Sequence, residues 1–253
     1  MRGAYIMSRL KTKAELLQAR DDFEAALALQ PDSSHALAGL ASTYFEAVLY
    51  RWTHERKATL QTAERLARQA LVIEPQNQVA MAMLAGSLVF DGRIDEAMAV
   101  TRRHLALNPN DSQAIANLAA QYYFAGRWEE SLQQVDAAIR LNPLDRLSLA
   151  NCHALAATAL IPLHRYDEAI ERARLVLDGP RAGGLFLVAS AEAWRGNLDA
   201  AQVHTAEMLE RKPDMTIASL RRGSKVPAYL DGMEHFYEGL RRAGMPEGSA
   251  ETR

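Results

Sequence analysis

Apolar and small residues recur along residues 112–145 with the spacing of two successive helices. In the first half of this segment they fall at Ile115, Leu118, Ala119 and Tyr122, which lie on one face of a helix. The second half has its own inner face, at Ser131, Val135 and Ala138. The pattern therefore predicts two antiparallel helices packed face to face within 34 residues.

Turn-forming residues mark the ends of these two helices. Gly126 follows the first helix, and glycine readily adopts the positive φ that a helix end often requires. Trp128 begins the return. Pro143 ends the second helix because its ring removes a backbone donor and clashes with the preceding turn. Asp145 can then cap the helix that follows.

The same pattern recurs on both sides of this segment. Five units are predicted, at residues 34–77, 78–111, 112–145, 146–181 and 182–215. A degraded hairpin precedes them at residues 1–33, with a short helix near Ala4–Leu10 and a longer one at Ala14–Gln30. A C-terminal cap follows at residues 216–246, where Asp231–Arg242 is predicted to be an amphipathic helix with a polar outer face. Residues 247–253 are small or charged and are expected to form a flexible tail.

Two units are longer than the others. The unit 34–77 carries about ten extra residues near Leu49–Thr62, which are expected to extend its first helix and to add a loop. The unit 146–181 gains about four residues, one turn, in its first helix, with Pro162 near the end of that helix.

The central unit resembles a tetratricopeptide repeat (TPR). It matches the family pattern with Leu118, Ala119, Tyr122, Ala138 and Pro143. It departs from that pattern at Ser131 and Val135. The resemblance implies an all-α fold, a right-handed TPR α-solenoid of antiparallel helix pairs with a C-terminal capping helix. It also implies a scaffold that binds other proteins.

Three segments and the insertion after the first complete unit carry a narrower resemblance. The start ARDDFEAALALQPDSSHALAGLASTY, the extended HRYDEAIERARLVL unit and the ending LRRAGMPE, in this order with that insertion, are similar to the C-terminal TPR region of bacterial regulators. In those regulators the repeats follow a class III nucleotide cyclase domain or a winged-helix DNA-binding domain. No strand pattern occurs in this sequence, so neither of those domains is predicted here.

Composition and charge limit the classes of partner. The net charge of −2 gives no basic excess for nucleic acid or an anionic membrane, so neither is expected as a partner. The short pairs Arg102–Arg103, Arg221–Arg222 and Arg241–Arg242 are interpreted as solvated faces rather than nucleic-acid contacts. One cysteine, no membrane span and no apolar run of signal-peptide length point to a cytoplasmic protein.

Catalytic motifs are missing from the sequence. No phosphate-binding GxGxxG or GxxxxGK[ST] loop, HExxH or GxSxG occurs, so no enzyme activity, cofactor or metal is predicted. No two of the seven histidines are three or four residues apart. Cys152–His153 is interpreted as a buried structural cysteine beside a histidine, since adjacent helical residues point about 100° apart. The acidic pairs Glu129–Glu130 and Asp167–Glu168 are interpreted as helix-dipole partners, with acid–base catalysis as the remote alternative.

A concave groove lined by the first helices is the predicted binding site. Counted from the start of each unit, positions 2, 5, 9, 12 and 13 face it in this architecture, and position 6 lies beside them. The candidate groove residues are Val79, Ala82, Phe90, Ala116, Asn117, Tyr123, Phe124, Phe186 and Trp194. These residues are mainly apolar or small, which favours an apolar or amphipathic protein segment as ligand. The alternative is that Tyr123, Phe124 and Trp194 only pack between repeats.

The leading hypothesis is a non-enzymatic scaffold for protein–protein interaction. The alternative is a regulatory or sensory module of a bacterial nucleotide cyclase or transcriptional regulator, and a weaker idea is small-molecule sensing in the groove. Self-association into a homo-oligomer is also possible. A clamp for a C-terminal carboxylate is disfavoured because the groove positions carry no lysine.

The helix crossing gives the first testable prediction. Ala119 and Ser131 are placed where the two helices cross, because side chains this small let helix axes approach to the short end of the usual 8–10 Å or so. We expect Ala119→Arg to break the hairpin and to lower the melting temperature measured by circular dichroism. A melting temperature equal to that of the parent protein would show that the register is wrong.

Overall fold

The computed structural model describes residues 12–177, 183–221 and 226–248, and these form thirteen helices without any strand. They fall into two compact units, unit 1 (Met1–Pro109) and unit 2 (Asn110–Arg253). Unit 1 contains α2 (Lys13–Leu29), α3 (Ser34–Leu49), α4 (Arg56–Ile73), α5 (Gln78–Phe90) and α6 (Ile94–Leu107). Unit 2 contains α7 (Ser112–Phe124), α8 (Trp128–Leu141), α9 (Arg146–Leu160), α10 (Tyr166–Arg174), α11 (Gly183–Trp194), α12 (Leu198–Arg211), α13 (Ile217–Leu220) and α14 (Pro227–Arg242). The predicted helix at Ala4–Leu10 lies outside the described residues.

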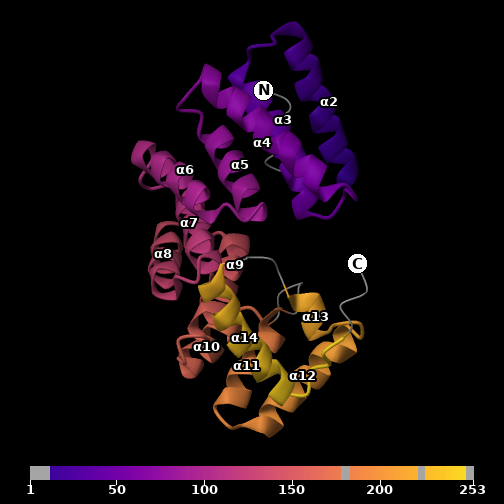
Figure 1. Ribbon diagram of the computed structural model, residues 1–253, viewed down its shortest axis with the longest axis vertical. Helices are drawn as coiled ribbons and strands as arrows, with labels where there is room; N and C mark the ends of the chain where they lie inside the picture. The colour runs from indigo at the N-terminus through magenta and orange to yellow at the C-terminus, as the bar shows by residue number, and fades with distance from the viewer. Residues whose placement is uncertain (1–11, 178–182, 222–225, 249–253) are drawn as a thin grey trace. The chain divides into compact units, whose positions relative to one another are not determined.

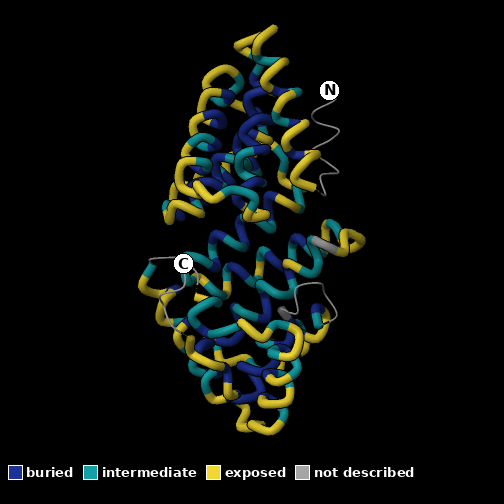
Figure 2. Tube along the Cα trace, turned by 90° about the vertical axis from the view of Figure 1, so that its right-hand side faces the viewer, coloured by how far each residue is buried: buried dark blue, intermediate teal, exposed yellow. Residues whose placement is uncertain are grey.

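Each unit is a stack of helical hairpins. In unit 1, α3 pairs with α4 and α5 with α6, while α2 packs on α3. In unit 2, the pairs are α7 with α8, α9 with α10, and α11 with α12. Figure 2 shows buried stretches inside each stack and exposed stretches along its outer helices. The all-α fold predicted from the spacing of apolar residues is therefore confirmed.

Small residues lie where the paired helices cross. Ser131 and Ala119 are fully buried, and the Ser131 hydroxyl donates a hydrogen bond to the Ala119 carbonyl oxygen at 2.9 Å. This bond satisfies the buried hydroxyl at the position where the central unit departs from the family pattern. The other hairpins cross at alanines that are at most 2% exposed, namely Ala41, Ala63, Ala85, Ala97, Ala157, Ala169, Ala189 and Ala201. Their burial is what the predicted register requires.

The first helices are capped by the side chains that precede them. Ser33, Asn77 and Asp111 each accept a hydrogen bond from a backbone N–H of the helix that follows, at 3.0 to 3.3 Å. These bonds satisfy N–H groups that have no partner inside the helix. The first helix therefore begins at the same place in successive units.

Three of the second helices, α6, α8 and α10, are preceded by an arginine that makes no side-chain capping bond. Arg93, Arg127 and Arg165 each pair with a glutamate three residues later, at 2.6 to 2.7 Å. These arginines hold the pKa of Glu96, Glu130 and Glu168 below the usual value. The pairs are largely solvent-exposed, so each adds little to stability. They agree with the interpretation of these acidic residues as partners of the helix start.

The insertion in the unit 34–77 is shared between its two helices. α3 has 16 residues against 13 in α5, and α4 has 18 against 14 in α6. The connection between α3 and α4 contains Arg51 with φ 57°, and the stacked rings of Tyr50 and Trp52 lie 4.9 Å apart. The prediction placed the added helical turn in the first helix alone, whereas the structure lengthens both.

The C-terminal region contains the predicted amphipathic helix, with bounds that differ from those expected. α14 begins at Pro227, four residues before the predicted start, and its N-terminal proline needs no backbone partner there. α14 packs on α11, and Figure 1 shows it crossing α9, α10 and α11. Glu247, predicted to belong to the flexible tail, instead accepts a backbone hydrogen bond from Ala218 at 2.9 Å and pairs with Arg241 at 3.0 Å. Residues 249–253 lie outside the described part of the chain.

Candidate functional site

In unit 2, helix α14 lies against the predicted groove residues of α7 and α11. At one end of this contact, the Tyr229 ring lies 5.4 Å from the Tyr123 ring and 5.6 Å from the Phe124 ring. The Tyr123 hydroxyl donates a hydrogen bond to the Met233 sulfur at 3.1 Å. Tyr123 is 8% exposed as a result. Two predicted groove residues on α7 therefore contact a helix more than 100 residues away in the sequence.

Glycines bring α14 close to the hairpins. A Cβ added to Gly232 would lie 2.4 Å from the Trp128 ring, which begins α8. A Cβ added to Gly126, in the turn between α7 and α8, would lie 2.6 Å from the Ala228 backbone. No side chain fits at either position without movement of its neighbours. The fit of α14 therefore depends on backbone contact as well as on side-chain packing.

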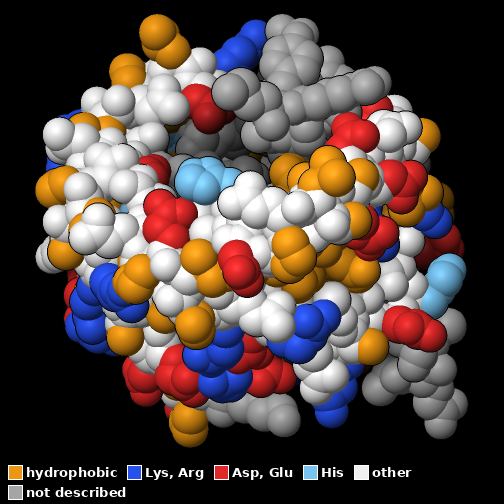
Figure 3. All heavy atoms as spheres, turned by 90° about the horizontal axis from the view of Figure 1, so that it is seen from above, with side chains coloured by type: hydrophobic (Ala, Val, Ile, Leu, Met, Phe, Trp, Pro, Cys, Tyr) orange, Lys and Arg blue, Asp and Glu red, His pale blue; other side chains and the backbone are white. Residues whose placement is uncertain are grey.

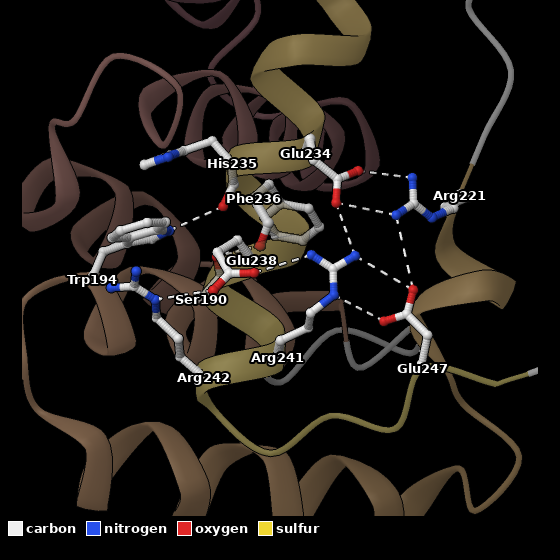
Figure 4. Close-up of polar contacts among 10 residues, drawn as sticks. All are labelled: Ser190, Trp194, Arg221, Glu234, His235, Phe236, Glu238, Arg241, Arg242 and Glu247. Carbon is white, nitrogen blue, oxygen red and sulfur yellow. Dashed lines mark hydrogen bonds and ion pairs between the residues drawn. The ribbon is translucent and has the colours of Figure 1, made fainter.

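Polar contacts fix the other end of α14 against α11 (Figure 4). The Trp194 indole N–H donates to the His235 carbonyl oxygen at 3.0 Å, and the Ser190 hydroxyl donates to the Phe236 carbonyl oxygen at 2.8 Å. The Arg242 guanidinium lies over the Trp194 ring at 3.8 Å from its centroid. Phe186, also on α11, packs edge-on against Phe236.

A chain of ionisable side chains links α10 to α14. The Tyr166 hydroxyl lies 2.7 Å from His164 Nδ1 and 2.9 Å from His235 Nε2. The two imidazole rings are 4.6 Å apart, and the His235 ring also stacks on Trp194 at 4.0 Å. Burial, the nearby His164 and the Arg242 charge lower the pKa of His235. Neutral His235 is therefore the form that suits this contact.

The outer edge of α14 carries an ion-pair network. Arg241 contacts Glu234 at 2.8 Å, Glu238 at 3.2 Å and Glu247 at 3.0 Å, and Figure 4 shows these three carboxylates around its guanidinium. Arg221 pairs with Glu234 at 2.9 Å from the end of α13. These arginines lower the pKa of Glu234. The network ties the polar side of α14 to the segments before and after it.

Two of the predicted groove residues in unit 1 are exposed to solvent. Val79 is 51% exposed and Phe90 is 37% exposed, both on α5. The Phe90 ring packs against Phe45 of α3 at 5.6 Å, and the Arg56 guanidinium lies 4.9 Å from its centroid. Gly86 lies beneath, where a Cβ would meet the Phe45 ring at 2.6 Å. This surface combines small and aromatic residues, as the groove of unit 2 does.

Glu46 on α3 stands at position 13 of its unit, a predicted groove position, and is partly buried. No described residue forms an ion pair or a side-chain hydrogen bond with it, and it lies next to Phe45 in the sequence. Burial alone raises the pKa of Glu46 from 4.5 to about 7. A carboxylate held in an apolar surface without a cation is costly for the folded protein.

The nine predicted groove residues fall into three groups. Tyr123, Phe124, Phe186 and Trp194 meet on α14 in unit 2. Val79 and Phe90 are exposed on unit 1. The remaining three are partly buried, namely Ala82, Ala116 and Asn117. Asn117 accepts a hydrogen bond from the Gln113 side chain at 3.1 Å. Binding of a partner by these nine residues stays a prediction.

Sequence reasoning missed two parts of this site. It found the apolar stripe of α14 and interpreted it as that of a capping helix, but it did not foresee the contacts of this helix with Tyr123 and Phe124 of α7. It also passed over Phe45 and Glu46, although they stand at the groove positions 12 and 13 of the unit 34–77. The same positional counting that selected Phe90 would have selected both.

The remaining candidates from the sequence are the cysteine, possible metal ligands, membrane-spanning helices and surface charge. Cys152 is buried with its thiol free, and burial raises the pKa of that thiol, as expected of a structural cysteine. Among the described residues, no three His, Cys, Asp or Glu side chains lie together in a way that could hold a metal ion. None of the described helices has the length and apolar character to cross a membrane. On the face shown in Figure 3, Lys and Arg side chains are interspersed with Asp and Glu.

The comparisons with known proteins agree with this architecture. Residues 58–122 match the family model of the tetratricopeptide repeat. The comparison with curated protein sequences finds no match. The described helices and these matches identify a helical-repeat protein with the fold of a TPR α-solenoid.

Three solved structures have this fold. PilW, a type IV pilus biogenesis factor, is 19% identical, with a TM-score of 0.66 over 80% of this chain and 88% of its own. PilF of Pseudomonas aeruginosa is 18% identical, with a TM-score of 0.63 over 92% of this chain and 93% of its own. YrrB, a TPR protein with an unusual peptide-binding site, is 15% identical, with a TM-score of 0.56 over 76% of this chain and 93% of its own. Identities this low establish the shared fold alone. The narrower resemblance to cyclase and winged-helix regulators stays a prediction.

The contact between the Gly126 turn and α14 can be tested with two glycine variants. Gly126 and Gly196 both have positive φ, 72° and 85°, but a Cβ at Gly196 would meet nothing within 4 Å. We expect Gly196→Ala to cost about 1 kcal/mol in the free energy of unfolding, from backbone strain alone. Gly126→Ala should cost at least about 1 kcal/mol more, because it also displaces α14. If urea denaturation shows equal losses in the free energy of unfolding for the two variants, the observed contact between α14 and the Gly126 turn is contradicted.

The His235 contact predicts a pH dependence. Because the folded state lowers the pKa of His235, the unfolded chain takes up this proton first as the pH falls below about 6.5. The contribution of neutral His235 to stability is therefore present above pH 6.5 and is lost as the pH falls. His164, Tyr166, Arg242 and Glu238 face or neighbour this ring. We expect urea denaturation at pH 8.0 and 5.5 to show a smaller loss on acidification for His235→Gln than for the parent protein. If both proteins lose the same stability between pH 8.0 and 5.5, protonation of His235 is not the cause of that loss.

Proposed function

We propose that the protein is a non-enzymatic scaffold that binds a segment of another protein on the concave face of unit 1. The observation that supports this proposal is α14, an amphipathic helix that packs against the predicted groove residues of α7 and α11 in unit 2. The chain thus contains an example of the ligand that a face of this kind accepts. Its function rests on binding alone and needs no catalytic group.

The residues that α14 buries describe the ligand class. Tyr229, Met233, Phe236 and Leu240 are all at most 5% exposed and recur at spacings of three and four residues. Such spacing places one stripe of an amphipathic helix in a groove, a common mode of peptide recognition. An apolar or amphipathic helix is therefore the partner that we propose for unit 1.

The predicted groove of unit 1 has the features that such a helix requires. Ala82 is small and only partly buried, which favours a close approach, and Phe90 and Val79 offer exposed apolar surface. Burying an aromatic side chain fully contributes about 1.5–3 kcal/mol, so the partial burial of Phe90 is a useful but incomplete source of affinity. Several neighbouring positions must therefore contribute together.

Affinity capture from an extract of the source organism tests the proposal. Immobilised parent protein is compared with Phe90→Ala and with Val72→Ala, which removes a side chain that is 82% exposed on α4, outside the groove. We expect a protein partner whose recovery, measured by mass spectrometry, falls about tenfold with Phe90→Ala and is unchanged with Val72→Ala. Circular dichroism confirms that both variants are folded. Equal recovery on all three proteins would contradict binding at this face.

A further inference from the structure

The carboxylate of Glu46 distinguishes the predicted groove of unit 1 from that of unit 2. Glu46 occupies position 13 of its unit, which is also the position of Phe90 in α5 and of Trp194 in α11. All three are groove positions of a first helix. At the other two positions an aromatic ring stands, whereas Glu46 brings a negative charge into a surface that is otherwise small and aromatic.

At both of these aromatic positions a cation lies over the ring. The Arg242 guanidinium, carried by the occupant helix α14, lies 3.8 Å from the Trp194 ring centroid. The Arg56 guanidinium lies 4.9 Å from the Phe90 ring centroid. Glu46 has no such cation among the described residues, although a carboxylate attracts one more strongly than a ring does. The groove thus offers a place for a cation that the described chain does not fill.

The insertion adds apolar surface beside this carboxylate. Leu49 and Tyr50 stand three and four residues after Glu46, so they share its side of the helix end. They are 51% and 43% exposed, and the Tyr50 ring stacks on Trp52. The alkyl stem of a lysine or arginine packs well on such a surface while its charged end reaches a carboxylate.

We propose that unit 1 recognises its partner through a Lys or Arg side chain that pairs with Glu46, while flanking apolar residues of the same segment pack on Phe90 and Val79. This inference rests on the proposed function and names the chemistry of the partner. An acidic or purely apolar segment would leave the Glu46 carboxylate buried and unpaired, which costs affinity. A basic residue removes that cost, and the raised pKa of Glu46 should fall again when the pair forms.

Parallel selection of peptides tests this inference. A phage-displayed library of random 16-residue peptides is panned against the full chain and three variants, Glu46→Gln, Phe90→Ala and Glu24→Gln. Glu24 is an exposed glutamate on α2 and serves as the matched control. We expect the parent protein and Glu24→Gln to enrich peptides with a Lys or Arg between helically spaced apolar residues. Glu46→Gln should lose the preference for a basic residue, and Phe90→Ala should enrich such peptides at least tenfold less.

A synthetic peptide from this selection then measures the pair directly. Fluorescence anisotropy at pH 8 should show about tenfold weaker binding to Glu46→Gln, a typical effect for a charge-assisted hydrogen bond. Replacing the basic residue of the peptide by glutamine should weaken binding to the parent protein equally. The two changes together should weaken it no further, because they remove the same interaction. Equal affinity for the parent protein and Glu46→Gln would overturn the inference.

The outcomes separate this inference from the proposed function. Enriched peptides that depend on Phe90 but show no basic preference would overturn the Glu46 pairing alone. If the parent protein enriches no peptides that depend on Phe90, both proposals fail. The melting temperature of Glu46→Gln at pH 8 gives an independent check, since removal of an unpaired buried carboxylate should leave it unchanged or higher. A lower melting temperature would reveal a partner for Glu46 within the fold and would overturn the inference.

Discussion

Close crossing of the paired helices is the constraint on which the rest of the structure depends. At the crossing of α7 and α8, Ala119 and Ser131 leave no room for larger side chains, and the Ser131 hydroxyl is satisfied by the Ala119 carbonyl. Because paired helices are held this close, the larger side chains are directed to the surfaces between hairpins and to the concave faces. Those faces are therefore rich in aromatic residues although aromatic residues make up only 7% of the chain.

Much of the fold could be predicted because its determinants are local. Gly126, Pro143 and the alternation of small and large residues act within a few positions, so the hairpins and their register follow from short stretches of sequence. The placement of α14 could not be obtained in this way. Its apolar stripe, which includes Met233 and Phe236, would suit either an end cap or a groove, and only contacts with distant residues such as Tyr123 decide between them.

In the candidate site, too, some features follow from local sequence and others depend on contacts between distant residues. Counting positions identified Trp194 and Tyr123 as groove residues, but counting cannot tell whether a groove is open or already holds a helix. The sequence also could not show that the insertion lengthens both α3 and α4. The added residues are common in helices, so no residue marks where either helix ends. The two units now have distinct roles in our proposal. The face of unit 2 is satisfied within the chain, whereas unit 1 is the face on which we expect a partner to be recognised.

The two glycines within α14 have a consequence for how this helix forms. Gly232 and Gly239 lie against Trp128 and Ser190, where any side chain would collide. Each glycine also disfavours the helix by about 1 kcal/mol relative to alanine, so the segment is a poor helix former by itself. We therefore expect helix formation by α14 to depend on its contacts with the rest of unit 2, so that the segment becomes helical as it packs there. Its backbone amides should accordingly open to hydrogen exchange together, as one cooperative element, rather than fray one turn at a time.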